Sequence, residues 1–218
     1  MTTVTYSGTG QVTIQAPAFN ARAFREAFRS RSFPALARLF ALASDPAKEW
    51  TESWAALHKL RKYHSTPTTV LHIGDGAHAR TAALYAFHTK HLNVSIDPRA
   101  NPATVARWEH ELGIEVERLL VVPARAEDVV AREARNAWAP TGKPLLLTFV
   151  HAHVNTEKIL ALIPTHMWAA AYVSACCEPQ AQLIRQDSSV ARVVDQGEDW
   201  TILSPERTYQ VLAPGAPL

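Results

Sequence analysis

The sequence predicts an α/β fold: a mostly parallel, doubly wound sheet that ends in a C-terminal antiparallel hairpin and is preceded by a small helical N-terminal section. Three observations indicate this fold class. From Thr68 onward, short apolar runs alternate with helical periodicity, which is the rhythm of β–α–β units. The run 145–150 is almost wholly apolar, as expected of a strand covered on both faces. Near the C-terminus the alternation stops, and Gln196-Gly197-Glu198-Asp199 separates two apolar segments as a hairpin turn does.

The N-terminal section, residues 1–66, combines a predicted hairpin with predicted helices. Residues 4–6 and 11–14 alternate around a Ser-Gly-Thr-Gly turn, which indicates a short hairpin. Helices are predicted over residues 20–32, over residues 34–43, and from Asp45-Pro46 onward, where an N-cap residue precedes a proline. In the last helix, apolar residues recur at the spacing of a core-facing stripe. They are Trp50, Trp54, Leu57 and Leu60.

The second section, residues 67–218, contains the alternating elements. Parallel strands are predicted over residues 69–73, 93–96, 118–122, 145–150 and 168–174. The helices between them are predicted over residues 77–90, 102–112, 127–138 and 156–163. Residues 190–195 and 200–203 are expected to form the antiparallel hairpin, and residues 208–212 are a candidate for one further strand.

Composition limits the class of protein. The 218 residues are 47% apolar, enough for one large core, or one core with a small appendage. Residues 1–15 are polar, unlike a signal peptide, and no run reaches the roughly 18 apolar residues of a membrane helix. We therefore expect a soluble protein without a membrane partner. The only cysteines, Cys176 and Cys177, are adjacent, which excludes an ordinary intrachain disulfide and favours the reducing cytoplasm.

The most informative segment runs from Val70 to Asp97. A predicted strand ends at Gly74-Asp75-Gly76, a helix follows, and the next strand ends in the carboxylate of Asp97, 23 positions after Gly74. Glycines at such a turn let the backbone bend sharply and let a ligand approach the helix N-terminus. An acidic residue at this spacing is where such folds hydrogen-bond a ribose diol. The segment predicts a site for a small molecule that contains a nucleoside.

From Thr68 to about Leu212 the chain resembles the class I S-adenosylmethionine-dependent methyltransferases. The resemblance rests on Ile73-Gly74-Asp75-Gly76, on Asp97 and on the finishing antiparallel hairpin. It implies a Rossmann-like domain at residues 67–218 with S-adenosylmethionine as cofactor. The glycine turn would line its methionine part, Asp97 would hold its ribose, and the loop 124–128 would cradle its adenine. The implied cofactor-binding residues are Gly74, Asp75, Gly76, Asp97, Ala126 and Glu127.

The chain departs from that family at the ends of two strands. The strand at 145–150 is followed by His151-Ala152-His153, where many members carry an acidic or Asn-Pro-Pro motif. Imidazole suits a general base near neutral pH, so His151 and His153 are the predicted catalytic residues. The next strand is followed by Cys176-Cys177-Glu178. Together these side chains suggest zinc as an alternative, but no metal-binding spacing accompanies them, and we predict no metal site.

Charge is distributed unevenly along the chain. Residues 1–66 hold 9 basic and 4 acidic residues, a balance of +5, while residues 67–218 hold 13 and 16, a balance of −3. The basic helices either dock the phosphates of a nucleic-acid substrate or present ordinary solvated faces. Three functions follow: a methyltransferase for a small molecule or nucleic acid, an inactive methyltransferase-like scaffold in an assembly, or an NAD-dependent oxidoreductase. The last fits the G-x-G-x-x-A form of the turn. The sequence does not indicate the oligomeric state.

Overall fold

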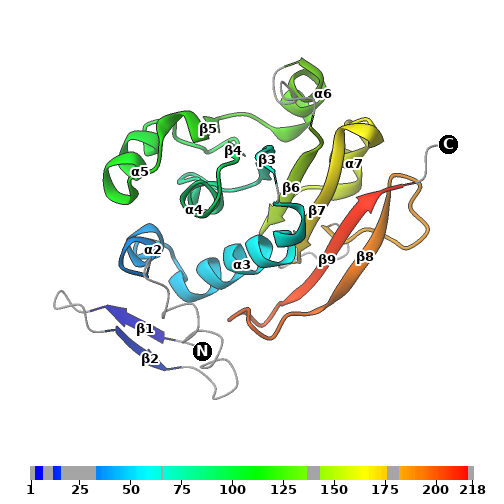
Figure 1. Ribbon diagram of the computed structural model, residues 1–218. Coiled ribbons are helices and arrows are strands. Elements are labelled where there is room, and N and C mark those ends of the chain that lie inside the picture. The colour runs from blue at the N-terminus through cyan, green and yellow to red at the C-terminus, as the bar shows by residue number, and fades with distance from the viewer. Residues whose placement is uncertain are drawn as a thin grey trace.

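The computed structural model describes residues 3–6, 12–15, 33–64, 66–136, 143–175 and 182–215. Seven strands form one sheet in the order β5-β4-β3-β6-β7-β9-β8 (Figure 1). Strands β3 to β7 are parallel, and β9 runs antiparallel between β7 and β8. This arrangement confirms the predicted α/β fold with its C-terminal antiparallel hairpin. The strands are β3 Thr69–Ile73, β4 Leu92–Ile96, β5 Leu119–Val122, β6 Leu145–Val150, β7 Trp168–Ser174, β8 Ala191–Glu198 and β9 Thr208–Pro214.

Helices cover both faces of this sheet. On one face, α2 to α5 share an apolar cluster with Val70, Leu146 and Tyr172; on the other, α6 and α7 pack with Leu71, Leu147 and the alternate strand residues. Figure 1 shows α6 and α7 on the side of the sheet opposite α3 and α4. The described helices are α2 Phe33–Phe40, α3 Pro46–Lys59, α4 Arg80–His88, α5 Thr104–Leu112, α6 Ala126–Asn136 and α7 Thr156–Ala161, with single 3₁₀ turns η1 Arg61–Tyr63, η2 Val116–Arg118 and η3 Thr165–Met167.

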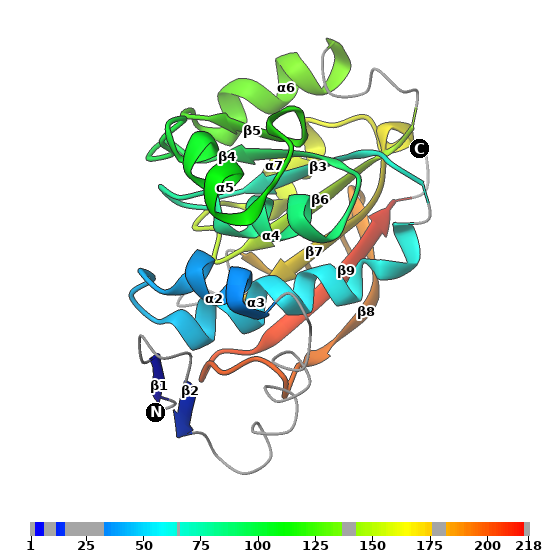
Figure 2. The ribbon, with the colours of Figure 1, turned by 60° about the vertical axis from the view of Figure 1, so that its left-hand side comes forward.

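The N-terminal section joins the core of the sheet through α3. Asp45 caps this helix by accepting a bond from the Lys48 backbone N–H at 3.2 Å, as the Asp-Pro signal predicts. The predicted apolar stripe is confirmed, since Trp50 and Leu60 are buried and Trp50 stacks on Phe40. Figure 2 shows α3 lying across the antiparallel end of the sheet. The predicted hairpin forms as β1 Thr3–Tyr6 and β2 Val12–Gln15, whereas the helix predicted over 20–32 lies outside the described residues.

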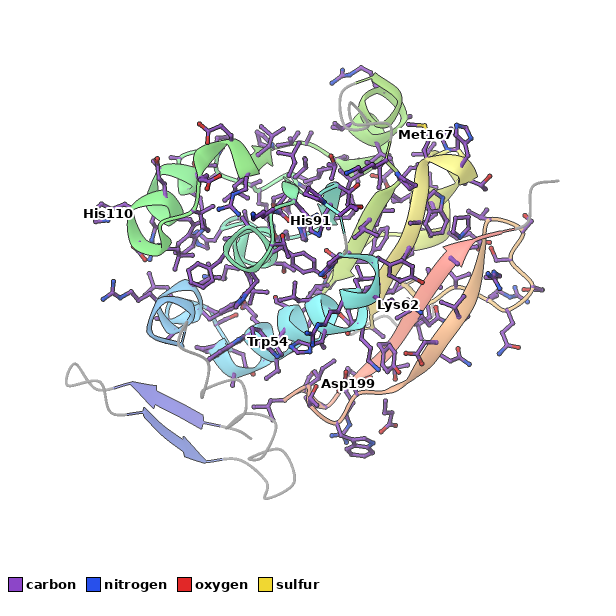
Figure 3. The ribbon with its side chains drawn as sticks, viewed as in Figure 1. Trp54, Lys62, His91, His110, Met167 and Asp199 are labelled. Carbon is purple, nitrogen blue, oxygen red and sulfur yellow. The ribbon has the colours of Figure 1, made fainter. Side chains whose placement is uncertain are left out.

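Three local predictions are wrong. Gln196, Gly197 and Glu198 do not form the predicted hairpin turn, because they are the last residues of β8 and pair with β9. Residues 200–203 form a turn and not a strand, because the Asp199 carboxylate accepts bonds from the Thr201 N–H and hydroxyl. The turn brings Leu203 into contact with α3, where the Leu203 backbone N–H donates to the Thr51 hydroxyl at 2.9 Å. Figure 3 shows Asp199 beside that helix. The hairpin partner of β8 is therefore β9. Helix α4 begins at Arg80 and not at residue 77, because Ala79 has a left-handed backbone with φ +50°.

Candidate functional site

The candidate site is a cleft formed by two adjoining cavities at the carboxyl ends of the parallel strands. Their volumes are about 390 Å³ and 590 Å³, and both are lined by Gly74, Arg99, His151 and His153. The cleft opens where β3 and β6 are neighbours although they are not consecutive, so the strand order reverses there. Ligands of open α/β sheets bind at this switch point.

Every predicted site residue lines this cleft. Gly74, His151 and His153 face both cavities. Asp75 and Gly76 line the smaller cavity, and Asp97, Ala126 and Glu127 line the larger one. Ala126 is buried at the first position of α6, beside Arg125 in the preceding loop. The structure thus brings the residues together, while their individual roles toward a ligand stay predictions.

The two positions of the turn carry glycine for different physical reasons. Gly74 has φ +71°, and a Cβ there would lie 2.8 Å from Cα of Ala152 and 2.9 Å from its Cβ, so the turn after β3 packs directly on the turn after β6. Gly76 has φ +72°, yet a Cβ there would meet nothing within 4 Å. Only glycine fits position 74, and the backbone of position 76 is open to an approaching molecule.

Asp75 uses its carboxylate to cap α4. Its two oxygens accept bonds from the backbone N–H groups of Thr81 at 2.8 Å and Ala82 at 2.9 Å. Burial raises the pKa of Asp75 to about 6, although these hydrogen bonds work in the opposite direction. The first turn of the helix is therefore already occupied by an acidic side chain of the protein itself.

Asp97 holds the glycine turn and faces the larger cavity. One carboxylate oxygen accepts a bond from the Gly76 N–H at 3.0 Å, and the other accepts from the Arg99 N–H at 2.7 Å. The Arg99 side chain also lies 3.5 Å from Asp97, but it is 80% exposed, so this ion pair is a weak surface contact. Because each carboxylate oxygen has two acceptor positions, Asp97 retains capacity to accept bonds from ligand hydroxyls.

His151 is the best-supported of the two histidines. It follows β6 with a left-handed backbone, φ +55°, which is uncommon for a residue with a side chain. Its Nε2 contacts a carboxylate oxygen of Glu52, a fully buried residue of α3. Burial raises the pKa of the Glu52 carboxyl, against the stabilising effect of His151 on the charged form. His153, two residues on, is exposed and lines both cavities.

The sequence did not point to Glu52. The one available sign was that its α3 neighbours are small residues, which allow a second face of the helix to pack closely. These neighbours, Ser53, Ala55 and Ala56, are buried. The helical stripe of Trp50 and Leu57 indicated only which face meets the core.

Other chemically suggestive residues have different outcomes. His72 is a core residue with satisfied ring nitrogens, which lie 2.8 Å from the Thr148 hydroxyl and 3.1 Å from the Asn93 side-chain oxygen. Cys176, Cys177 and Glu178 lie outside the described residues. Within the described ranges, no group of three or more His, Cys, Asp or Glu side chains could hold a metal ion. Over the same ranges, no helix is long and apolar enough to cross a membrane.

No protein-family model matches the sequence, and no curated protein sequence matches it. Solved structures do match its fold. A single-site variant of MtNAS in complex with S-adenosylmethionine shares 11% identity over 91% of this chain and 72% of its own, with a TM-score of 0.52. The 1,6-didemethyltoxoflavin-N1-methyltransferase of Burkholderia thailandensis shares 17% identity over 99% of this chain and 96% of its own, with a TM-score of 0.50. With its strand order and final antiparallel pair, the chain has the fold of the class I S-adenosylmethionine-dependent methyltransferases.

Proposed function

We propose that this protein binds S-adenosylmethionine in the larger cavity and methylates a small molecule held in the smaller one. The observation that carries the proposal is the pair of cavities that adjoin at His151 and Gly74, at the switch point of a methyltransferase-type sheet. Two compartments that share a wall of side chains suit a reaction in which two molecules meet.

The residues of the larger cavity fit such a cofactor. Its volume of about 590 Å³ lies in the range of small-molecule sites. Asp97 stands at the end of the second parallel strand, where it would accept bonds from ribose hydroxyls, and Ala126 and Glu127 would flank the adenine. The methionine portion would extend from the larger cavity past Gly74, which lines both cavities, toward the open backbone of Gly76 in the smaller one. When bound, S-adenosylmethionine supplies an electrophilic methyl group on its sulfonium sulfur.

The smaller cavity favours a small acceptor without strong net charge. It holds about 390 Å³ and is lined by charges of both signs, including Asp45, Lys48 and Glu49 of the N-terminal section. Arg80 is already paired with Glu49 at 2.9 Å and donates to the Leu39 carbonyl. A surface that recognises nucleic acid is instead dominated by positive charge. The nucleic-acid alternative depends on two groups of basic residues. Arg22, Arg25, Arg29 and Arg31 lie outside the described residues, whereas Arg38, Lys59, Arg61, Lys62 and His64 lie within them.

In the proposed reaction, His151 and His153 would act on the acceptor. Both line the wall shared by the two cavities, so either ring would lie beside the reacting atoms. A histidine there can orient the acceptor by a hydrogen bond and remove a proton from it. Acceptor and cofactor held in line need little further chemical help.

The NAD alternative conflicts with the position of Asp75. A dinucleotide places its pyrophosphate on the N–H groups of the helix that follows the glycine turn. Here the Asp75 carboxylate occupies the N–H groups of Thr81 and Ala82. A phosphate would have to displace this acidic side chain or lie against it, and both arrangements are unfavourable.

Isothermal titration calorimetry tests the proposal with S-adenosylmethionine, S-adenosylhomocysteine and NAD. We expect both sulfur compounds to bind and NAD not to bind. Asp97→Asn should weaken S-adenosylhomocysteine binding about 10-fold or more, because a hydrogen bond to a charged group contributes about 1.5–3 kcal/mol. Asp187→Asn is the matched control, since Asp187 is exposed and lines neither cavity.

Two results would contradict the proposal. Binding of NAD without either sulfur compound would favour an oxidoreductase. Binding of none of the three would favour the scaffold alternative. Equal affinities of the wild-type protein and Asp97→Asn would show that the ribose site lies elsewhere, while the wild-type binding data would still decide the cofactor.

A further inference from the structure

A buried carboxylate from the N-terminal section reaches the centre of the cleft. Glu52 lies in the middle of α3, its side chain is 0% exposed, and its Oε2 contacts Nε2 of His151. The His151 side chain is 24% exposed and lines both cavities. Glu52 lines neither cavity, so it reaches the cleft only through His151.

The backbone holds His151 in one orientation. Its left-handed φ of +55° is energetically unfavourable for a residue with a Cβ, and such residues cluster at functional sites. The neighbours Val150 and Ala152 are buried on either side, and Ala152 packs against Gly74. The ring is therefore positioned at both ends, by its backbone turn and by Glu52.

The surroundings of the pair leave His151 as the main partner of the carboxylate. On α3 itself, Lys48 and Glu49 act on Glu52 with opposite signs. From the sheet, the buried Tyr172 of β7 lies close enough to be influenced by Glu52, and burial raises the pKa of its hydroxyl, so it stays neutral. A buried negative charge without a neutralising partner is costly, which makes a cationic His151 the favourable neighbour.

We infer, on the basis of the proposed function, that Glu52 is a positioning residue that fixes His151 as the proton acceptor for a methyl acceptor bearing an N–H or O–H group. With Nε2 in contact with the carboxylate, the proton of the neutral ring is expected on Nε2 and the lone pair on Nδ1. Taking up a second proton then turns a buried negative charge into a neutral ion pair.

The proton step balances within the acceptor and the pair. The N–H or O–H bond of the acceptor breaks, and its electron pair stays on the heteroatom, which thereby becomes the stronger nucleophile. The proton passes to Nδ1 of His151, and Glu52 keeps its contact with Nε2 throughout. Water regenerates the pair by taking the proton from His151 afterwards.

NMR of ¹⁵N-labelled protein tests this arrangement without a substrate. The His151 ring signals, assigned with His151→Gln, report which nitrogen carries the proton and how the ring titrates. We expect the Nε2–H tautomer above the titration midpoint in the wild-type protein. In Glu52→Gln the midpoint should move at least about one pH unit lower, because the neighbouring carboxylate that favours the cation is lost. Glu49→Gln, the same substitution one turn earlier on α3, should leave it within about 0.3 units.

The outcomes separate positioning from mere packing. An Nδ1–H tautomer in the wild-type protein, as when Glu52 acts as a neutral hydrogen-bond donor, would overturn the inference, and this measurement does not depend on whether Glu52→Gln folds. An unchanged midpoint in a folded Glu52→Gln would also overturn it. S-adenosylhomocysteine should bind Glu52→Gln within about threefold of wild type, since Glu52 does not line the larger cavity. Failure of the wild-type protein to bind it would remove the proposed function, while the NMR result would still decide the pairing.

Discussion

The contact between the turns after β3 and β6 allows the loss of stability in Gly74→Ala to be estimated. The new methyl group would lie 2.8 Å from Cα and 2.9 Å from Cβ of Ala152, and backbone atoms cannot move aside as the end of a flexible side chain can. Position 74 also has φ +71°, where any residue with a Cβ is strained. Two costs therefore act together, one from backbone conformation and one from packing.

Their sum can be estimated and separated. The left-handed conformation costs roughly 1–2 kcal/mol for alanine. Overpacking a filled site costs typically about 1–3 kcal/mol more. We expect Gly74→Ala to lower the free energy of unfolding by about 2–5 kcal/mol. Gly113→Ala is the matched control, because Gly113 has φ +66° and a Cβ there would meet nothing within 4 Å, so only the conformational cost applies.

Urea denaturation followed by tryptophan fluorescence measures both variants against the wild-type protein. The difference between Gly74→Ala and Gly113→Ala isolates the packing contact with Ala152. If the two substitutions destabilise equally, the close approach of the two turns is wrong, and with it the geometry of the wall that the cavities share. Gly76→Ala should behave like Gly113→Ala in stability, since its surroundings are equally open.

Two further outcomes can be checked by the same method. Burial lowers the pKa of His72 to about 3 from 6.5, so the unfolded chain takes up a proton below pH 6.5 that the folded chain does not, and stability is lost as the pH falls. The raised pKa of Asp75, about 6 against 3.8, acts in the opposite direction, so the variant His72→Gln is needed to isolate the effect of the histidine. Between pH 7 and pH 5, the free energy of unfolding of the wild-type protein should fall by about 2 kcal/mol more than that of this variant. Tyr209→Phe should lower the free energy of unfolding by about 1 kcal/mol, because the Tyr209 hydroxyl accepts a bond from Lys59 at 2.6 Å and donates one to Asp195 at 3.0 Å. An unchanged unfolding midpoint would count against this link between α3 and the hairpin.

Strands and glycine turns were readable from the sequence because their signals are local. The strand 69–73 is bounded by Pro67 on one side and Gly74 on the other, and the run 145–150 is apolar at every position except Thr148. Asp97 was identifiable because parallel strands end at one edge of the sheet, which fixes its place relative to Gly74. The strand predicted at 200–203 was wrong because Ile202 and Leu203 are buried in the apolar cluster that includes α3, where the Leu203 N–H donates to Thr51, and not by strand pairing.

The role of Asp75 was hidden for a related reason. The letters Gly-Asp-Gly fit both a dinucleotide turn and a methyltransferase turn, and they do not say where the carboxylate between the glycines points. That direction depends on the left-handed backbone of Ala79, which brings the start of α4 back toward Asp75. Alanine carries no sequence signal for such a conformation, so the choice between the two ligand classes had to come from three-dimensional contacts.

Glu52 shows how the site depends on both sections of the chain. The periodicity of α3 identified the inward face of Trp50 and Leu57. Glu52 lies on another face, and the strand end that it meets depends on how α3 docks across the sheet. Docking is a long-range property, set by contacts such as the 3.1 Å bond between the hydroxyls of Ser53 and Thr81 and by the burial of Leu203 on α3. The boundary expected near residue 66 therefore divides the chain by composition and not by chemistry. The histidine of the cleft comes from residues 67–218, and the carboxylate that orients it comes from residues 1–66.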